Sequence, residues 1–309
     1  MKHFINLKDI SSSDLRKIVE DAKKRKQKRK RLNTLDKDRD CPLNGKLLIQ
    51  MFEKSSLRTR LSFYLAIKQL GGGALTLRPD ELHLARGGES IEDTAKILST
   101  YGNGFMLRSN SDEKLEEFSK YITIPIINGL SPSSHPTQVL SDIFTVEEIK
   151  KKPISKLNIC WIGDSNNVLN SLIAASVKFS FILNIGCPKN YEPNKSVLDW
   201  VKKNKKKINI FNDPKKAAKN ADVIFSDKVI SLNDKVNKIK KIKDFKKFQV
   251  NSKLISCAKK DVIFLHCLPR GTEVTDKVFL GKNSKVWQQA LNRVHVQKSI
   301  LLYCFNKLR

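Results

Sequence analysis

The chain has 309 residues, of which 40% are hydrophobic. A chain of this length exceeds what one hydrophobic core usually organises, so we predict two domains. Fifty-nine Lys and Arg against thirty-one Asp and Glu give a formal charge of +28, which favours polyanionic partners in general. The apolar runs are too short to cross a bilayer and the chain begins with no signal peptide, so we expect a cytoplasmic protein without a membrane partner.

The cysteines and the basic runs could indicate a zinc site, disulfides or a nucleic-acid site, but their patterns do not fit any of these. Six cysteines occur without any C-x-x-C pair, which argues against a zinc site and against a disulfide scaffold. The basic runs 23–31, 202–207 and 235–247 carry no stacking platform of the kind used by single-strand binders. We interpret them as solvated lysine-rich surface and do not expect a nucleic-acid partner; a basic nucleic-acid-binding protein remains the alternative from a different class.

The first half of the chain alternates short apolar runs with amphipathic ones. A helix is expected to begin at Ser11 to Ser13, which are suitable N-cap residues. The later pattern predicts strands at 46–52, 74–77, 104–108 and 124–129, and helices after 56, after 90 and from 136. This alternation is typical of a parallel sheet covered on both faces.

The stretch 53–60, Glu-Lys-Ser-Ser-Leu-Arg-Thr-Arg, lies between a predicted strand and a predicted helix. Hydroxyls, guanidinium groups and a helix N-terminus together favour a phosphate site, although a simple Ser N-cap followed by exposed arginines fits the same eight residues. Arg108 ends a strand, where α/β sheets bind ligands. His135 and Gln138 flank the helix start at Pro136, either as ligands or as structural caps.

The second half repeats the rhythm. Strands are predicted at 157–163, 179–185, 208–211 and 221–227 and from 262, with a Lys-rich insert at 228–252 and a closing helix at 286–301. After Gly163 the second and third glycines of a G-x-G-x-x-G dinucleotide fingerprint are missing. Asp227 and Cys267 each end a buried strand, although a buried structural role is usual for such a cysteine.

Five segments, 52–60, 135–138, 161–168, 264–270 and 273–279, resemble the ornithine carbamoyltransferase family in order and spacing. The resemblance implies an α/β fold of two doubly wound parallel-sheet domains joined by helices, with the C-terminal helix packing back on the first domain. It implies a carbamoyl phosphate-binding domain at 1–133, joined by the helix 290–309, and an ornithine-binding domain at 134–289. It also implies a homotrimer with active sites near the subunit interfaces.

Site residues follow from the same resemblance, position by position. Carbamoyl phosphate is expected to contact Ser56, Leu57, Arg58, Thr59, His83, Arg108, His135, Gln138, Cys267, Leu268 and Arg293. His83 falls near the residue that a neighbouring subunit lends to this site. Ornithine is expected to contact Asn167, Asp227, Ser231 and Leu232.

The implied reaction gives L-citrulline and phosphate, for arginine biosynthesis. An uncharged δ-amine attacks the carbamoyl carbon, and Arg58, Arg108 and His135 stabilise the charge on the carbonyl oxygen. Asp227 and Cys267 orient the amine and favour loss of its proton. The chemistry calls for no metal and no other cofactor.

Two positions depart from the family pattern. Leu57 replaces a threonine hydroxyl, and a lost hydrogen bond to phosphate costs about 1 kcal/mol or more. The segment 227–233, which contains the altered loop 228–233, keeps only Asp227 and Ser231 of the pattern Asp-x-Trp-x-Ser-Met-Gly. Two alternatives therefore stay open: a carbamoyltransferase for another amine, such as putrescine or an acylated ornithine, and a catalytically weak relative.

Overall fold

The computed structural model describes residues 1–78, 88–230 and 237–308. The chain divides into two compact units, Met1–Phe144 with Ala290–Arg309, and Thr145–Gln289. Each unit is built on one parallel sheet, which confirms the predicted α/β fold class, and the C-terminal residues belong to the first unit. The domain bounds given by the resemblance stay a prediction. Within the described part of the chain, no helix has the length and apolar character that spanning a membrane requires.

The sheet of the first unit has the order β2-β1-β3-β4, and every neighbouring pair is parallel. Its strands are β1 (Leu47–Phe52), β2 (Gly73–Leu77), β3 (Gly104–Arg108) and β4 (Ile126–Leu130). The strand order reverses on the two sides of β1, because the chain moves first to β2 and then across to β3. The carboxyl ends of β1 and β3 are therefore the place where a sheet of this kind binds ligands.

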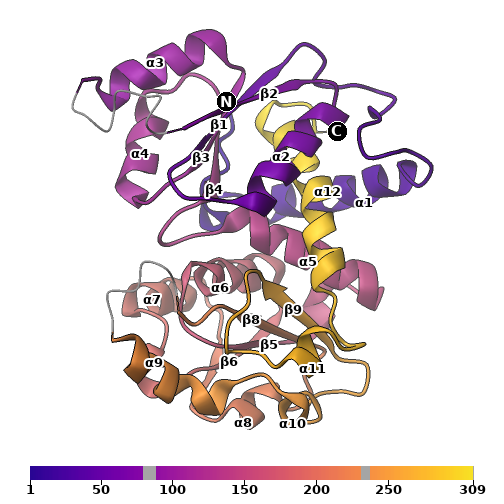
Figure 1. The fold of residues 1–309 in the computed structure, drawn as a ribbon, viewed down its shortest axis with the longest axis vertical. Coiled ribbons are helices and arrows are strands. Elements are labelled where there is room, and N and C mark those ends of the chain that lie inside the picture. Colours follow the sequence, from indigo (N-terminus) through magenta and orange to yellow (C-terminus); the bar gives the residue numbers. More distant parts are fainter. Residues whose placement is uncertain (79–87, 231–236, 309) are drawn as a thin grey trace. The chain divides into compact units, whose positions relative to one another are not determined.

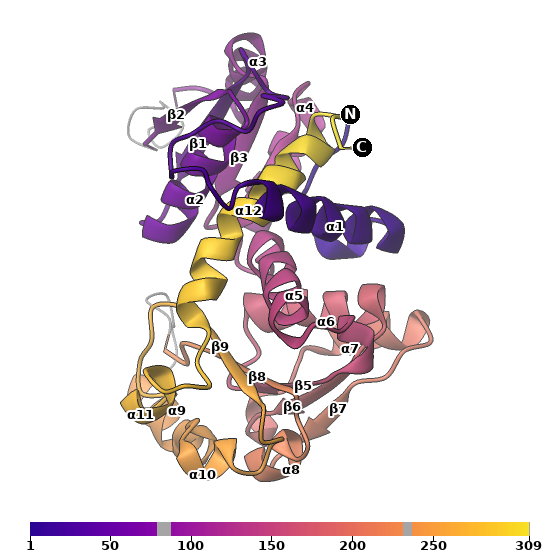
Figure 2. The same ribbon diagram turned by 90° about the vertical axis from the view of Figure 1, so that its right-hand side faces the viewer.

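Among the described residues, the α-helices that lie wholly or partly in the first unit are α1 (Ser12–Lys28), α2 (Leu57–Gln69), α3 (Ile91–Tyr101), α4 (Asp112–Tyr121), α5 (Pro136–Lys150) and α12 (Val286–Cys304). Helices α3 and α4 cover one face of the sheet, where Leu98 and Phe118 pack on Ile49 and Phe105. On the other face, Phe305 at the end of α12 lies against Gly104. In both views α12 runs beside α1 and α2 (Figure 1, Figure 2).

The sheet of the second unit has the order β7-β6-β5-β8-β9 and is again entirely parallel. Its strands are β5 (Asn158–Ile162), β6 (Ile182–Gly186), β7 (Asn209–Phe211), β8 (Val223–Asp227) and β9 (Ile263–Cys267). Here the order reverses at β5, between β6 and β8. The carboxyl ends of β5 and β8 form the second expected ligand position.

The remaining helices are α6 (Asn167–Phe179), α7 (Lys195–Lys203), α8 (Pro214–Ala218), α9 (Lys238–Phe245), α10 (Ser252–Ile255) and α11 (Asp276–Phe279). Helices α6 and α7 lie on one face of this sheet and α8 and α10 on the other (Figure 1, Figure 2). The second face buries Phe245, Phe248 and Leu254 against Ile224 and Phe264.

Two predictions about the second unit were wrong in detail. The strand expected at 179–185 begins only at Ile182, because Phe179 ends α6 and Ser180 adopts a left-handed conformation with a φ of 56°. The segment 228–252 is not only an insert. It contains α9, whose Phe245 packs in the core on one side while most of its lysines are exposed on the other.

Candidate active site

In the first unit, the site begins where β1 and β3 end beside each other. Phe52 and Arg108 are register partners, and the backbone N–H of Glu53 donates to the carbonyl of Arg108 at 3.0 Å. The Glu53 carboxylate accepts from Lys114 Nζ at 2.5 Å, from Ser109 Oγ at 3.0 Å and from the backbone N–H of Asn110 at 2.7 Å. Burial opposes ionisation, but these donors, Lys114 above all, hold the pKa of Glu53 below its usual value. Glu53 therefore fixes the start of the loop that leads into α2.

Ser56 stands at the N-cap position of α2 but makes no capping hydrogen bond with its side chain. Its hydroxyl instead accepts from Arg108 Nη1 at 3.2 Å. The first helical residue, Leu57, has 72% of its surface exposed, whereas Thr59 has 1%. The free N–H groups of this helix end and the Arg108 guanidinium therefore share one location, as an anion site requires. This arrangement favours the phosphate interpretation of 53–60 over a simple N-cap.

Arg293 of α12 joins the start of α2 to the start of α5. Its Nη2 donates to Thr59 Oγ1 at 2.7 Å, and its Nη1 donates to Gln138 Oε1. Gln138 in turn donates through Nε2 to Asp142 Oδ1 at 2.7 Å. Arg293 and Gln138 are almost completely buried, so their hydrogen bonds are well shielded from water. The resemblance assigns Thr59, Gln138 and Arg293 to one pocket, and in the structure Arg293 is in direct contact with both of the others.

His135 is buried among positive charges. Burial first, and then the guanidinium groups of Arg293, Arg108 and Arg58, lower the pKa of His135 well below its usual value. The imidazole is consequently neutral at neutral pH and offers a single N–H donor. A neutral donor beside three guanidinium groups suits an anionic ligand with a polar carbonyl, because the histidine adds a hydrogen bond without adding charge.

In the second unit, Asp227 and Cys267 are register partners at the ends of β8 and β9. Asp227 Oδ2 accepts from Asn166 Nδ2 at 2.8 Å. Burial raises the pKa of Asp227 to about 6, against the opposing effect of His266. A carboxylate with such a pKa binds a proton more readily near neutral pH than an ordinary aspartate, which suits a group that receives a proton from an amine.

The sequence predictions did not single out two residues, Asn166 and Glu273, that organise this second cluster. Asn166 caps α6, because its Oδ1 accepts from the backbone N–H groups of Val168 and Leu169 at 3.0 Å each. Glu273 accepts from His266 Nε2 at 3.0 Å and from the backbone N–H of Gly271 at 2.5 Å. It thereby links the end of β9, before Cys267, to the loop that follows Cys267. An Asn directly before a predicted helix was the available signal for Asn166.

The other predicted residues are placed as follows. Arg58 lies in the first turn of α2, Asn167 is the first residue of α6, and Leu268 directly follows β9. His83, Ser231 and Leu232 lie outside the described residues. Among the residues that the structure describes, no three His, Cys, Asp or Glu side chains form a group suited to a metal ion.

Comparisons with known proteins cover both units. Residues 2–148 match the family model described as aspartate/ornithine carbamoyltransferase, carbamoyl-P binding domain. Residues 155–304 match the model described as aspartate/ornithine carbamoyltransferase, Asp/Orn binding domain.

Similar proteins that match this chain over nearly its whole length are named ornithine carbamoyltransferase. The ornithine carbamoyltransferase of Brucella suis biovar 1 is 42% identical over 306 residues, which is 98% of this chain and 96% of that protein. The one from Methanosarcina acetivorans is 42% identical over 300 residues, covering 96% of this chain and 97% of that protein. The solved ornithine carbamoyltransferase structure from Pyrococcus furiosus has a TM-score of 0.90 and 40% identity, covering 97% of this chain and 96% of that one.

Proposed function

This chain belongs to the aspartate/ornithine carbamoyltransferase family, and on that premise we propose that it transfers the carbamoyl group of carbamoyl phosphate to the δ-amine of L-ornithine. The products are L-citrulline and phosphate, and the reaction serves arginine biosynthesis. The observation that carries the proposal is the cluster of Arg58, Arg108 and Arg293 around a neutral His135. Strong positive charge at a helix N-terminus selects a phosphorylated substrate.

The first unit binds carbamoyl phosphate. Ser56, Thr59 and the backbone N–H groups at the start of α2 hold the phosphate, with Arg58 and Arg108 as charged donors. His135 donates to the carbamoyl oxygen, and Gln138 and Arg293 complete the pocket. Because negative charge grows on the carbamoyl oxygen during attack, donors fixed in advance stabilise the transition state more than the ground state.

The second unit binds ornithine. Asp227 and Asn167 receive the amino acid, and Cys267 with Leu268 lies next to the reacting amine. The nitrogen of the neutral δ-amine forms a bond with the carbamoyl carbon, the bond from that carbon to the phosphate oxygen breaks, and the nitrogen loses its proton. Asp227 orients the amine and accepts that proton, which its raised pKa favours. Cys267 assists as a polar neighbour and not as a covalent nucleophile.

Three further expectations belong to the proposal. His83, Ser231 and Leu232 complete the two substrate sites, with His83 supplied by a neighbouring subunit. The working assembly is a homotrimer in the cytoplasm. No metal ion and no other cofactor takes part in the reaction.

The decisive experiment offers the purified protein carbamoyl phosphate together with ornithine, putrescine, N-acetylornithine or aspartate in separate reactions, and measures the carbamoylated product. The proposal predicts citrulline from ornithine at a rate at least about a hundred times that of the other amines, because Asn167 recognises the amino-acid end of the substrate. Putrescine lacks the carboxylate, N-acetylornithine lacks the free α-amine, and aspartate lacks a δ-amine. Turnover of another amine without citrulline would refute the choice of ornithine. Absence of any product would refute carbamoyl transfer.

A further inference from the structure

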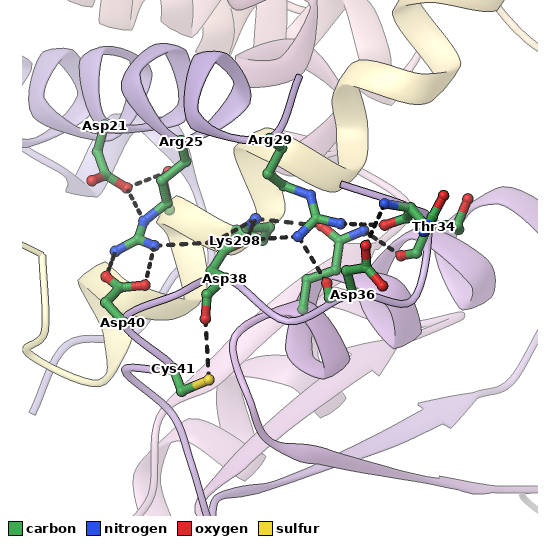
Figure 3. Close-up of polar contacts among 12 residues, drawn as sticks. Asp21, Arg25, Arg29, Thr34, Asp36, Asp38, Asp40, Cys41 and Lys298 are labelled. Carbon is green, nitrogen blue, oxygen red and sulfur yellow. Dashed lines mark hydrogen bonds and ion pairs between the residues drawn. The ribbon is translucent and has the colours of Figure 1, made fainter. Parts of the chain in front are cut away.

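A buried cluster of charges in the first unit lies outside the residues assigned to the substrates. Its centre is Asp38, which has 6% of its surface exposed. The Asp38 carboxylate accepts from Lys298 Nζ at 2.7 Å, from Arg29 Nη1 at 2.8 Å and from Arg25 Nη1 at 3.1 Å (Figure 3). Burying a carboxylate with three cationic side chains costs desolvation free energy, so we expect this cluster to have a structural or functional role.

Lys298 is the member of this cluster that lies on α12. Its side chain is completely buried, and burial lowers its pKa to about 8 although Asp38 acts in the opposite direction. Besides Asp38, Lys298 Nζ donates to Gln69 Oε1 at 3.3 Å, and Gln69 is the last residue of α2. The backbone N–H of Asp38 donates to the carbonyl of Gln69 at 2.7 Å. Lys298 therefore fastens α12 to the C-terminal end of α2.

Helix α12 is also bound to the N-terminal end of α2, through Arg293 and Thr59. Arg293 and Lys298 are five residues apart, which corresponds to about 7.5 Å along the helix axis. Two more bonds, from Lys26 to Asn292 at 2.7 Å and from Ser299 to Asp21 at 2.7 Å, hold the same stretch of α12 against α1. A displacement of α12 by one residue, about 1.5 Å, would separate Arg293 from Thr59 and Gln138.

We propose that Lys298 is a positioning residue for phosphate binding, which acts by holding the Arg293 guanidinium at Thr59 and Gln138. The inference rests on the proposed function, since it treats Arg293 as part of the carbamoyl phosphate pocket. Lys298 touches no substrate. Lys298 acts by fixing the position of α12, the helix that also carries Arg293, and Asp38 is the residue to which Lys298 is bound.

The test uses inorganic phosphate, the product of the reaction, as its probe, with the dissociation constant measured by calorimetric titration. Lys298→Met keeps the volume of the side chain and leaves Asp38 with Arg25 and Arg29, so we expect a folded protein. The expected result is a rise of about tenfold in the phosphate dissociation constant, the equivalent of one displaced charge-assisted hydrogen bond. The kcat at saturating carbamoyl phosphate is expected to stay within about twofold, with the change confined to KM.

Two comparisons separate positioning from a general loss of stability. Asp40→Asn is the matched control, because Asp40 binds Arg25 at the exposed edge of the same cluster; we expect its phosphate affinity to equal that of the wild type. In an Arg293→Met background, Lys298→Met should weaken phosphate binding no further, since the group that it positions is gone.

An unchanged phosphate dissociation constant in Lys298→Met would overturn the proposal. So would an equally large effect of Lys298→Met in the Arg293→Met background. If Lys298→Met does not fold, Gln69→Met removes the bond from Lys298 to the end of α2, together with the bond from Gln69 Nε2 to the carbonyl of Thr34, and should raise the constant about threefold; no rise would equally overturn the inference. Phosphate binding needs no ornithine, so a protein that binds phosphate but makes no citrulline would refute the proposed function and leave this test valid.

Discussion

Leu57 offers a substitution that should improve the enzyme. It is the first residue of α2, at the helix end that faces the proposed phosphate, and 72% of its surface is exposed. Leu57→Thr gives up little buried area, so the loss of folding free energy stays under about 1 kcal/mol. A threonine hydroxyl at this position adds a donor to a charged acceptor, which is worth about 1 to 1.5 kcal/mol. That energy corresponds to a rise of roughly five- to twelvefold in kcat/KM for carbamoyl phosphate.

Initial rates of citrulline formation at varied carbamoyl phosphate and saturating ornithine measure this effect. Leu57→Val is the matched control, because valine has the shape of threonine without the hydroxyl, and it should leave kcat/KM within about twofold of the wild type. Leu61→Thr, at another exposed leucine of the same helix with 52% exposure, tests whether a new hydroxyl anywhere on α2 has the effect. If Leu57→Thr does not raise kcat/KM, or Leu57→Val raises it equally, the phosphate is not bound at this helix end.

Three further predictions concern Asp227 in the second unit and Arg108 in the first. Asp227→Asn keeps an acceptor for Asn166 but loses the base, so kcat should fall by about a hundredfold or more, and a fall under tenfold would remove Asp227 from the chemistry. The pKa of Asp227 is about 6 in the folded protein and near 3.9 in an unfolded chain, so the wild type becomes progressively less stable as the pH rises from about 4 to 6. The Tm of Asp227→Asn relative to the wild type should therefore increase over that range of pH. A Tm difference that stays constant would contradict the raised pKa. Arg108→Met should raise the dissociation constant for inorganic phosphate by at least about tenfold with the Tm changed little, and unchanged phosphate affinity would place the anion elsewhere.

The strands and the ends of many helices could be predicted because local chemistry decides them. The strand 104–108 matches its predicted bounds, and α1 has Ser11 as its N-cap, whose side chain accepts from the backbone N–H of Asp14. The strand after α6 could not be placed as well, since a left-handed Ser180 gives no signal in the sequence pattern. Helix α9 was missed because its many lysines conceal the apolar side that carries Phe245.

The candidate site divides in a similar way. The strand-end positions of Arg108 and Asp227, which we propose to act on the substrates through their own chemistry, could be predicted, because each ends a strand beside a parallel neighbour. The residues that hold them in place could not. Glu53 and Glu273 act through partners that lie elsewhere in the chain, and the contact of Lys298 with Asp38 joins residues 260 positions apart. Such pairings depend on tertiary packing, which a single sequence does not display.

The measurement that tests the account most directly is the stoichiometry of one reaction mixture of protein, carbamoyl phosphate and L-ornithine. Phosphate release and citrulline formation are followed together, and the spontaneous decay of carbamoyl phosphate is subtracted from a mixture without protein. The account predicts one citrulline for each phosphate released by the protein, with both rates lost together in Asp227→Asn. Phosphate release without citrulline, or citrulline formation that survives Asp227→Asn unchanged, would contradict it.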